Sequence, residues 1–384
     1  MKKILAGLLA AALLGAGTVA AGAQCLVTGE NYGVGASAAV VMEAVTGEVL
    51  FSQNPRERLP IASTTKIMTA LLALEQPGLD EEFVVDPQAI RVEGSSMGLQ
   101  EGDTVTLRAL AGGMLAASGN DGANAAAVRI AGSVEAFAGK MNERAAQIGM
   151  RDSNFVTPSG LDAEGHYSTA YDMALLGREA LQNPVFAEIC AAKSVKVTFG
   201  SPPYERSLIN HNRLLRLYQD CVGIKTGFTK KAGRCLVSAA SRDGVTLICV
   251  TLNCPDDWDT HQALYERYFP MVTMRELVPE GTLAVPVAGG TTPEAELVQT
   301  ESFCWPAIQG RDETIVSRAF VTGFLYAPVL DGDIVGKMVY YIGETPIWES
   351  PLAVSGTVPA RPAERKKSIP ERIRGALFPQ GAEE

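Results

Sequence analysis

Residues 59–66 decide the fold, and they are Leu59-Pro60-Ile61-Ala62-Ser63-Thr64-Thr65-Lys66. An apolar pattern at helical spacing follows over residues 67–74, so we expect a helix that begins just before Ser63 and ends before Pro77. Residues three apart share a helix face, which brings the Lys66 amine within reach of the Ser63 hydroxyl. A serine becomes a nucleophile when a base removes its proton, and a lysine can be that base when burial and a helix N-terminus lower its pKa. By itself the S-x-x-K spacing is weak, because most such pairs are a solvated serine and a surface lysine.

Two later motifs also carry polar side chains. Ser118-Gly119-Asn120 follows an apolar run and fits a turn that points the serine and the asparagine into a cleft, although a helix cap is the simpler alternative. Lys225-Thr226-Gly227 lies in residues 222–229, which alternate like a strand. On such a strand Lys225 and Thr226 can bind a carboxylate, and Gly227 lets a substrate backbone approach closely. A solvated lysine in a strand is the alternative if this motif stands alone.

The rest of the first 270 residues predicts strands at both ends and helices between them. Residues 38–43 and 48–52 favour a hairpin that turns at Thr46-Gly47, and residues 234–241 and 245–252 favour two strands joined by a tight turn at 242–244. Helices are predicted at 107–117, 123–131, 134–148 with Ser133 as N-cap, and 169–181 with a stop at Asn183-Pro184. This order predicts an α+β domain with one sheet assembled from distant segments and covered by helices.

Length and composition set the limits of the interpretation. The chain has 384 residues, which suggests two or three domains at roughly 150 residues each. Its 47% hydrophobic content excludes disorder, and its net charge of −10 argues against a nucleic-acid partner, which requires a basic surface. Residues from about 277 to 358 hold short runs rich in Val, Thr and Tyr, typical of a small all-β module. We therefore predict a catalytic domain at 30–272, a β domain at 273–358 and a basic tail at 359–384.

The N-terminus predicts export. Lys2 and Lys3 precede an apolar run over residues 4–15 and an A-x-A site at 21–23, which is the layout of a signal peptide covering residues 1–23; a buried N-terminal helix is the alternative. We expect an extracytoplasmic protein and no lipid on Cys25, since the leucine of a lipobox is missing before it. The basic tail can rest peripherally on anionic lipid or wall polymer, or it can be a solvated chain end.

The cysteines argue against a metal site. Seven cysteines form no C-x-x-C pair, so a zinc site is not expected. Their odd number leaves at least one thiol free or paired between chains after export, and most are expected to be small core residues. They are Cys25, Cys190, Cys221, Cys235, Cys249, Cys254 and Cys304.

Taken together, the three motifs in this order form the signature set of penicillin-binding proteins and class A β-lactamases. The sequence closely resembles the low-molecular-mass penicillin-binding proteins that act as serine-type D-alanyl-D-alanine carboxypeptidases, from about residue 35 to 270. The likeness extends beyond the motifs to residues 67–70, 158–162, 210–215 and 228–229. The resemblance implies a β-lactamase/transpeptidase-like catalytic domain, with an antiparallel sheet flanked by helices, and a small C-terminal all-β stalk.

The resemblance also implies a role for each motif residue. Ser63 would attack the terminal D-Ala-D-Ala bond of a peptidoglycan stem peptide, with Lys66 as its base. Ser118, oriented by Asn120, would pass a proton to the departing D-alanine. Water would then release the acyl-enzyme, and β-lactams would be trapped at the acyl stage as covalent inhibitors. The family uses no metal or cofactor.

The substrate-binding residues would lie on the K-T-G strand. Lys225 and Thr226 would hold the terminal carboxylate of the substrate beside Gly227. Backbone N–H groups of Ser63 and Phe228 would form the oxyanion hole.

Two other functions stay open from the sequence. A class A β-lactamase has S-D-N in place of S-G-N and needs a glutamate that activates the deacylating water; the nearest candidate is Glu179 with Asn183, where helix termination is the simpler interpretation. A wall-binding protein with a silent site is disfavoured because every motif residue is present. His166 can line the cleft or have a structural role, and His211 and His261 lack a catalytic spacing.

Overall fold

The computed structural model describes residues 33–279, 283–311 and 313–362. The predicted signal peptide and all of the predicted tail beyond residue 362 lie outside these ranges. The described chain forms two compact units. One unit holds residues 33–275 together with 306–311, and the other holds residues 276–305 and the described residues from 313 onward.

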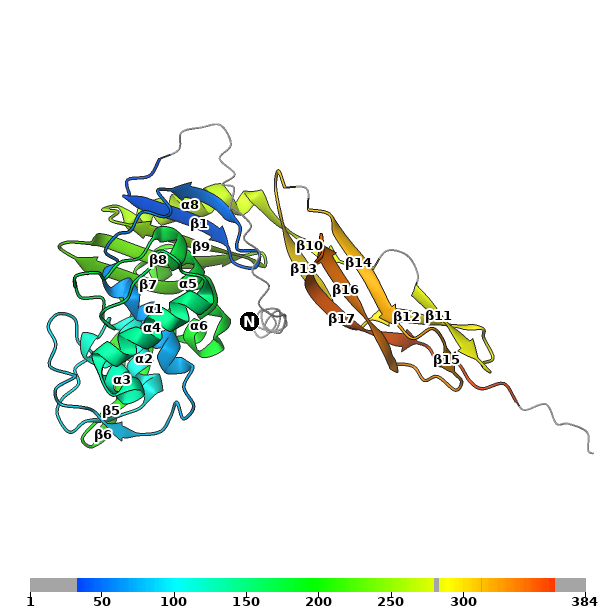
Figure 1. Cartoon of the computed structure of the whole chain (residues 1–384), viewed down its shortest axis with the longest axis horizontal. Coiled ribbons are helices and arrows are strands. Elements are labelled where there is room, and N and C mark those ends of the chain that lie inside the picture. Colours follow the sequence, from blue (N-terminus) through cyan, green and yellow to red (C-terminus); the bar gives the residue numbers. More distant parts are fainter. Residues whose placement is uncertain (1–32, 280–282, 312, 363–384) are drawn as a thin grey trace, which may run out of the picture. The chain divides into compact units, whose positions relative to one another are not determined.

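The first unit is built on a five-stranded antiparallel sheet (Figure 1). Strands from its two ends pair directly, since Val40 lies opposite Val250. The prediction of one sheet from distant segments is thereby confirmed, as is the hairpin near Thr46-Gly47. In spatial order the strands are β2 (Val49–Gln53), β1 (Ala38–Glu43), β9 (Val245–Leu252), β8 (Gly233–Arg242) and β7 (Cys221–Thr229).

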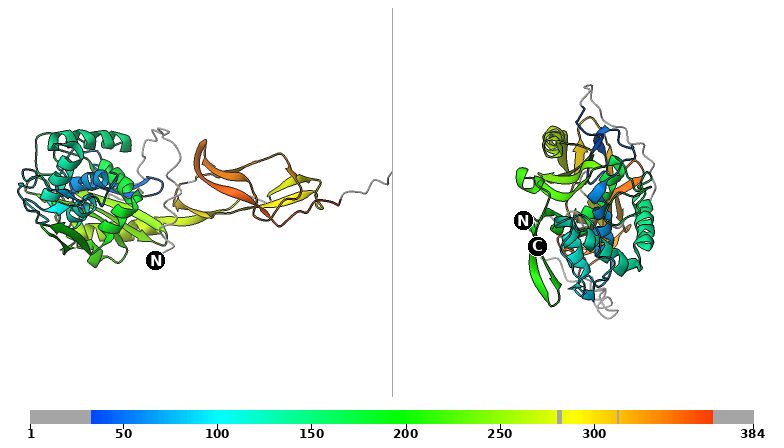
Figure 2. Two further views of the ribbon diagram at one scale, coloured as in Figure 1. Left: turned by 90° about the horizontal axis from the view of Figure 1, so that it is seen from below. Right: turned by 90° about the vertical axis from the view of Figure 1, so that its left-hand side faces the viewer.

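Alternation along the strands gives this sheet two apolar faces. On β1, Val40 and Met42 join the larger core, while Ala39 and Val41 join a second core with Tyr265. The second face is covered by α8 (Asp257–Tyr268), and Figures 1 and 2 show the longer helices of the unit gathered on the opposite side. These are α1 (Lys66–Leu74), α2 (Leu107–Ala116), α3 (Asn120–Ala131), α4 (Val134–Ile148), α5 (Ala170–Gln182) and α6 (Pro184–Ala191).

Three features differ from the prediction. The helix expected at 123–131 begins at Asn120 and not at Ala123, so the motif asparagine is its first residue. Asn183-Pro184 ends α5 as predicted, yet α6 follows at once, because Asn183 caps it and proline is tolerated at the first helical position. The prediction also lacked α7 (Leu214–Leu217) and the sheet β3-β4-β5-β6, whose strands are β3 (Phe83–Val84), β4 (Thr104–Val105), β5 (Ser194–Gly200) and β6 (Pro203–Ile209).

The second unit consists of strands, as the Val, Thr and Tyr-rich runs predict. Its six-stranded sheet has the order β14-β16-β17-β12-β11-β15. A separate two-stranded sheet pairs β10 (Val272–Leu277) with β13 (Phe303–Ile308), and the division between the units falls within both strands. The six strands are β11 (Leu283–Ala288), β12 (Glu294–Gln299), β14 (Ile315–Val321), β15 (Leu325–Tyr326), β16 (Ile334–Ile342) and β17 (Thr345–Ser355). No helix in the described ranges combines the length and apolar character that crossing a bilayer requires.

Candidate active site

Ser63 lies in a tight helical turn that leads into α1. Residues Ala62–Thr65 form a 3-10 helix, and α1 continues it from Lys66. Ala62 adopts a left-handed backbone conformation, with φ of 48°, directly before the serine. Two hydroxyls bond back across the turn: Thr64 Oγ1 donates to Ile61 O at 2.6 Å, and Thr65 Oγ1 donates to Ala62 O at 2.8 Å. These bonds stabilise the left-handed backbone conformation of Ala62, which is unfavourable for alanine. Ser63 itself is half-buried.

The Lys66 amine is buried and has three oxygen neighbours. Its Nζ atom lies 2.9 Å from Ser63 Oγ, 2.7 Å from Asn120 Oδ1 and 2.6 Å from Ser159 O. The oxygens of Asn120 and Ser159 can only accept hydrogen bonds. An ammonium group would donate to all three oxygens. A neutral amine that donates to Asn120 and Ser159 would keep its lone pair for the Ser63 hydroxyl. This is the arrangement that a general base requires.

The electrostatics of the site favour that neutral amine. Burial lowers the pKa of Lys66 well below its usual range; the positive charge of Lys225 lowers it further, while Asp121 opposes the shift. Burial also lowers the pKa of Lys225, to about 7. Both shifts favour the neutral amine, and Lys225 titrates near pH 7.

The second motif is held by a network of backbone contacts. Asn120 Nδ2 donates to Glu93 O at 2.6 Å, which fixes the orientation of its amide and leaves Oδ1 for Lys66. Ser118 has φ of 59° and is largely buried, in the short connection between α2 and α3. The buried carboxylate of Asp121 accepts backbone N–H groups from residues 97–99 and gathers that loop beside the motif.

The K-T-G strand lies against the serine turn. A Cβ atom at Gly227 would be 3.0 Å from the backbone nitrogen of Ser63 and as close to Ile61 O, so a side chain there would press on the turn. Lys225 is buried, with its Nζ donating to Thr226 O at 2.8 Å, and Thr226 is half-buried. Phe228 is 66% exposed. The strand thus places a cation and a backbone edge beside the nucleophile.

Sequence reasoning assigned no role to Ser159 and Gly160, which contact the site through their backbones. Ser159 O accepts the Lys66 hydrogen bond, and Gly160 has φ of 80°. A Cβ atom at Gly160 would overlap Ala62 O, at 1.9 Å. The glycine within residues 158–162, a segment shared with the family, could have indicated a close approach of two backbones. The use of a carbonyl oxygen leaves no signature in the side-chain pattern.

Glu179, Asn183 and His261 have structural partners. Glu179 forms a 2.6 Å ion pair with Arg144, which also binds Glu75, and Asn183 caps α6. Glu179 and Asn183 therefore stabilise helices, which agrees with the interpretation of this segment as a helix end. His261 is enclosed by hydroxyl groups, and His211 is exposed, with its backbone N–H donating to Ala116 O. The six described cysteines are free, and most are buried as predicted: Cys190, Cys235, Cys249 and Cys254.

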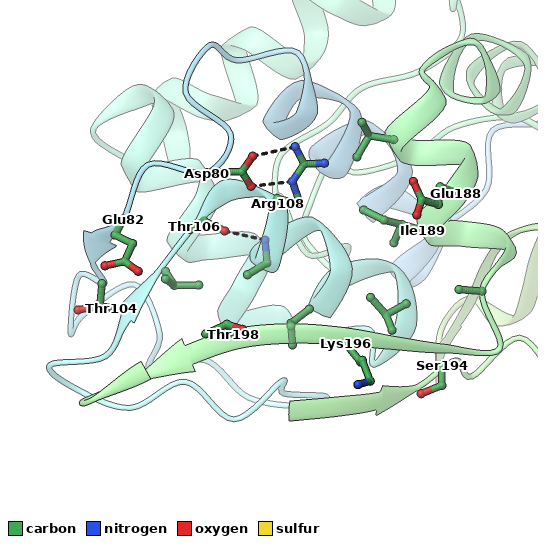
Figure 3. A pocket seen from close by; sticks show the side chains of 16 residues that line it. Asp80, Glu82, Thr104, Thr106, Arg108, Glu188, Ile189, Ser194, Lys196 and Thr198 are labelled. Carbon is green, nitrogen blue, oxygen red and sulfur yellow. Dashed lines mark hydrogen bonds and ion pairs between the residues drawn. The ribbon is translucent and has the colours of Figure 1, made fainter. Parts of the chain in front are cut away.

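A cavity of about 540 Å³ lies elsewhere in the first unit, between α2, α6 and the strand β5 (Figure 3). The bidentate ion pair between Arg108 and Asp80 borders it, with Glu188 and Lys196 nearby. None of the predicted site residues lines it, so it does not bear on the chemistry of Ser63.

Comparison with known proteins agrees with this geometry. The model of the peptidase S11 family, D-alanyl-D-alanine carboxypeptidase, matches residues 26–256. The D-alanyl-D-alanine carboxypeptidase DacF of Bacillus subtilis is 31% identical over 336 residues, which cover 83% of this chain and 84% of that protein. DacC of Escherichia coli, with the same description, is 33% identical over 353 residues, covering 86% of each chain.

Solved structures show the same fold. Penicillin binding protein 5 from Haemophilus influenzae aligns with a TM-score of 0.61 and 27% identity, covering 86% of this chain and 99% of that one. PBP3 from Streptococcus pneumoniae, described as a peptidoglycan synthesis regulatory factor, aligns with a TM-score of 0.68 at 22% identity, which shows the fold alone. The motif geometry, the fold and the relatives agree: this chain belongs to the peptidase S11 family of D-alanyl-D-alanine carboxypeptidases.

Proposed function

We propose that the protein removes the terminal D-alanine from peptidoglycan stem peptides by way of an acyl-enzyme on Ser63. The observation that carries the proposal is the 2.9 Å contact between Lys66 Nζ and Ser63 Oγ, across which a neutral lysine amine can take the serine proton. Membership of the peptidase S11 family identifies the bond that is cleaved, the terminal D-alanyl-D-alanine bond.

In the acylation step, Ser63 Oγ attacks the carbonyl carbon of the penultimate D-alanine as its proton passes to the neutral Lys66 amine. The C–N bond breaks, and the departing amino group receives a proton by way of Ser118, with Asn120 fixing the lysine. Backbone N–H groups of Ser63 and Phe228 are the proposed oxyanion hole, at about 3 kcal/mol for each donor. The close packing of Gly227 on the turn supports this placement.

The substrate carboxylate is assigned to the K-T-G strand. Protonated Lys225 attracts the anionic peptide terminus, and the Thr226 hydroxyl adds a hydrogen bond. Gly227 lets this strand pack against the Ser63 turn, where a Cβ atom would lie 3.0 Å from the Ser63 nitrogen. Because the whole chain carries a net charge of −10, attraction to this anionic substrate has to be local.

Water then hydrolyses the ester, which returns Ser63 and the shortened peptide. A β-lactam acylates the same serine, but its leaving group stays attached, so the adduct persists and inhibits the enzyme. A β-lactamase is disfavoured because Glu179 is held by Arg144. A silent wall-binding protein is disfavoured because the lysine is positioned and partly desolvated for catalysis.

Export and peripheral attachment complete the proposal. The pattern of residues 1–23 supports secretion to the cell envelope, and the basic tail from residue 359 supports contact with an anionic membrane surface. The catalytic domain at 30–272 and the β domain at 273–358 are kept as the proposed division.

The test is an incubation of the exported protein with penicillin, followed by intact mass. We expect a long-lived adduct that the substitution Ser63→Ala abolishes, and release of D-alanine from a diacylated peptide ending in D-Ala-D-Ala. Rapid turnover of penicillin would favour the β-lactamase, and absence of any adduct would favour the binding protein.

A further inference from the structure

Residues 156–166 form a loop that contacts the serine turn and the start of α1. It reaches Lys66 through Ser159 O, and it reaches the turn itself through His166. We propose that His166 is a positioning residue, which holds the Ser63 turn in its reactive conformation through a hydrogen bond to Thr65. This inference rests on the proposed function of Ser63.

Two successive hydrogen bonds connect His166 in the loop to Ala62, the residue before the nucleophile. His166 is 7% exposed, and its Nε2 atom lies 2.9 Å from Thr65 Oγ1. Thr65 Oγ1 in turn donates to Ala62 O at 2.8 Å. Ala62 directly precedes Ser63, so these two hydrogen bonds reach the residue next to the nucleophile.

The hydrogen bonds settle which nitrogen of His166 carries the proton. Its Nδ1 atom accepts backbone N–H groups from Val156, at 3.0 Å, and from Thr157, at 3.3 Å. An atom that accepts these bonds has no proton, so the neutral ring carries its proton on Nε2. His166 Nε2 therefore donates to Thr65 Oγ1, which leaves the threonine proton for Ala62 O. Burial supports the neutral ring, because it lowers the pKa of His166 to about 4, while Asp162 opposes the shift.

The turn needs such a restraint because of its backbone. Ala62 has φ of 48°, where an L-residue other than glycine or asparagine is strained. Gly160 packs on Ala62 O from the same loop. The loop therefore fixes the Ala62 carbonyl from two sides, and a shift of that carbonyl would move Ser63 relative to Lys66.

Histidine at this position has two separable hydrogen-bonding functions. Asparagine can replace the Nδ1 acceptor that holds the loop, and glutamine can replace the Nε2 donor that reaches Thr65. A merely structural histidine would be replaced by asparagine at least as well as by glutamine. A positioning histidine would be replaced better by glutamine.

The experiment measures the rate of acylation by penicillin in His166→Gln, His166→Asn and Thr65→Val, together with the melting temperature of each. We expect His166→Gln to retain most of the rate, and His166→Asn and Thr65→Val to lose roughly 10- to 100-fold. The double variant H166N/T65V should be no slower than T65V alone, because each substitution already removes the hydrogen bond between residues 166 and 65.

The matched control is His261→Asn. His261 is a buried histidine of the same unit, held by Ser238 and Thr251, and it contacts none of the site residues. We expect a lower melting temperature and a normal acylation rate. Equal acylation by His166→Asn and His166→Gln, a normal rate in Thr65→Val, or an equal loss in His261→Asn would overturn the proposal. An adduct that persists in Ser63→Ala would instead overturn the proposed function.

Discussion

Asn120 Oδ1 accepts a hydrogen bond from Lys66 Nζ at 2.7 Å, across 54 residues of sequence. The amide cannot turn over, because its nitrogen donates to Glu93 O at 2.6 Å. The oxygen therefore faces the lysine and accepts one of its N–H groups. This neutral acceptor orients the amine without adding a negative charge that would keep it protonated.

Replacing Asn120 with aspartate should shift the pH dependence of acylation. A carboxylate beside Lys66 stabilises the ammonium form and raises the pKa of the lysine, by about one to three pH units for a close opposite charge. The rate of acylation by penicillin should fall at neutral pH and recover at higher pH. The rate is measured between pH 5 and pH 10.

Asn120→Ala is the control for this shift. It removes the contact without adding charge, so its rate should fall with little displacement of the pH profile. If Asn120→Asp kept the profile of the original protein, Lys66 would not be the group that titrates.

Replacing Lys66 with arginine should abolish acylation while keeping a positive charge. A guanidinium does not lose its proton in proteins, so it cannot take the proton of Ser63. We expect a loss of roughly 10²- to 10⁴-fold in the acylation rate, the usual range for a general base. Lys66→Ala should lose a similar factor, and normal acylation in either variant would refute the role of Lys66 as the base.

Much of this site follows from side-chain chemistry at fixed spacing. Ser63, Lys66 and Asn120 could be found because a nucleophile and its base need particular residue types, and helix ends such as Ser133 were visible as caps. The contribution of Ser159 is a backbone carbonyl, which any residue possesses. The hairpin β5–β6 was not predicted, although residues 194–199 alternate polar and apolar side chains, which is the local pattern of a strand.

The same limit applies to protonation. The sequence identifies Lys66 and Lys225 as lysines of two motifs, but the lowering of both pKa values depends on burial and, for Lys66, also on the charge of Lys225. The sequence left open whether His166 lines the cleft or has a structural role. Its hydrogen bond to Thr65 joins segments 101 residues apart, which spacing alone does not predict.

The fall of kcat/KM at alkaline pH should reflect the deprotonation of Lys225. Its pKa of about 7 means that the free enzyme loses this charge as the pH rises through neutrality. The protonated form binds the substrate carboxylate, so kcat/KM for D-alanine release should fall above about pH 7. Lys225→Arg, which stays charged, should have a lower value that no longer falls over pH 7–9. An unchanged alkaline limb in Lys225→Arg would assign the limb to another group.

A side chain at Gly160 should disable the site. Its φ of 80° is unfavourable for alanine, and the added Cβ would overlap Ala62 O. We expect Gly160→Ala to lower the free energy of unfolding by more than about 1 kcal/mol and to slow acylation in the protein that remains folded. Denaturant unfolding and penicillin acylation measure the two effects.

Gly132→Ala separates strain from overlap. Gly132 has φ of 81°, yet a Cβ atom there would meet nothing within 4 Å. It should lose stability from backbone strain alone and acylate at the normal rate. Equal acylation in the two glycine variants would show that the contact with Ala62 is not needed.

Glu179 should matter for stability and not for hydrolysis of the acyl-enzyme. Its 2.6 Å ion pair with Arg144 is partly exposed, so Glu179→Gln should lower the free energy of unfolding by less than about 1 kcal/mol. Glu75→Gln is the matched control, because Glu75 binds the same arginine at 2.7 Å. Both variants should release the penicillin adduct at the rate of the original protein, as followed by intact mass. A slower release in Glu179→Gln alone would give this glutamate the water-activating role of a β-lactamase, which its contact with Arg144 argues against.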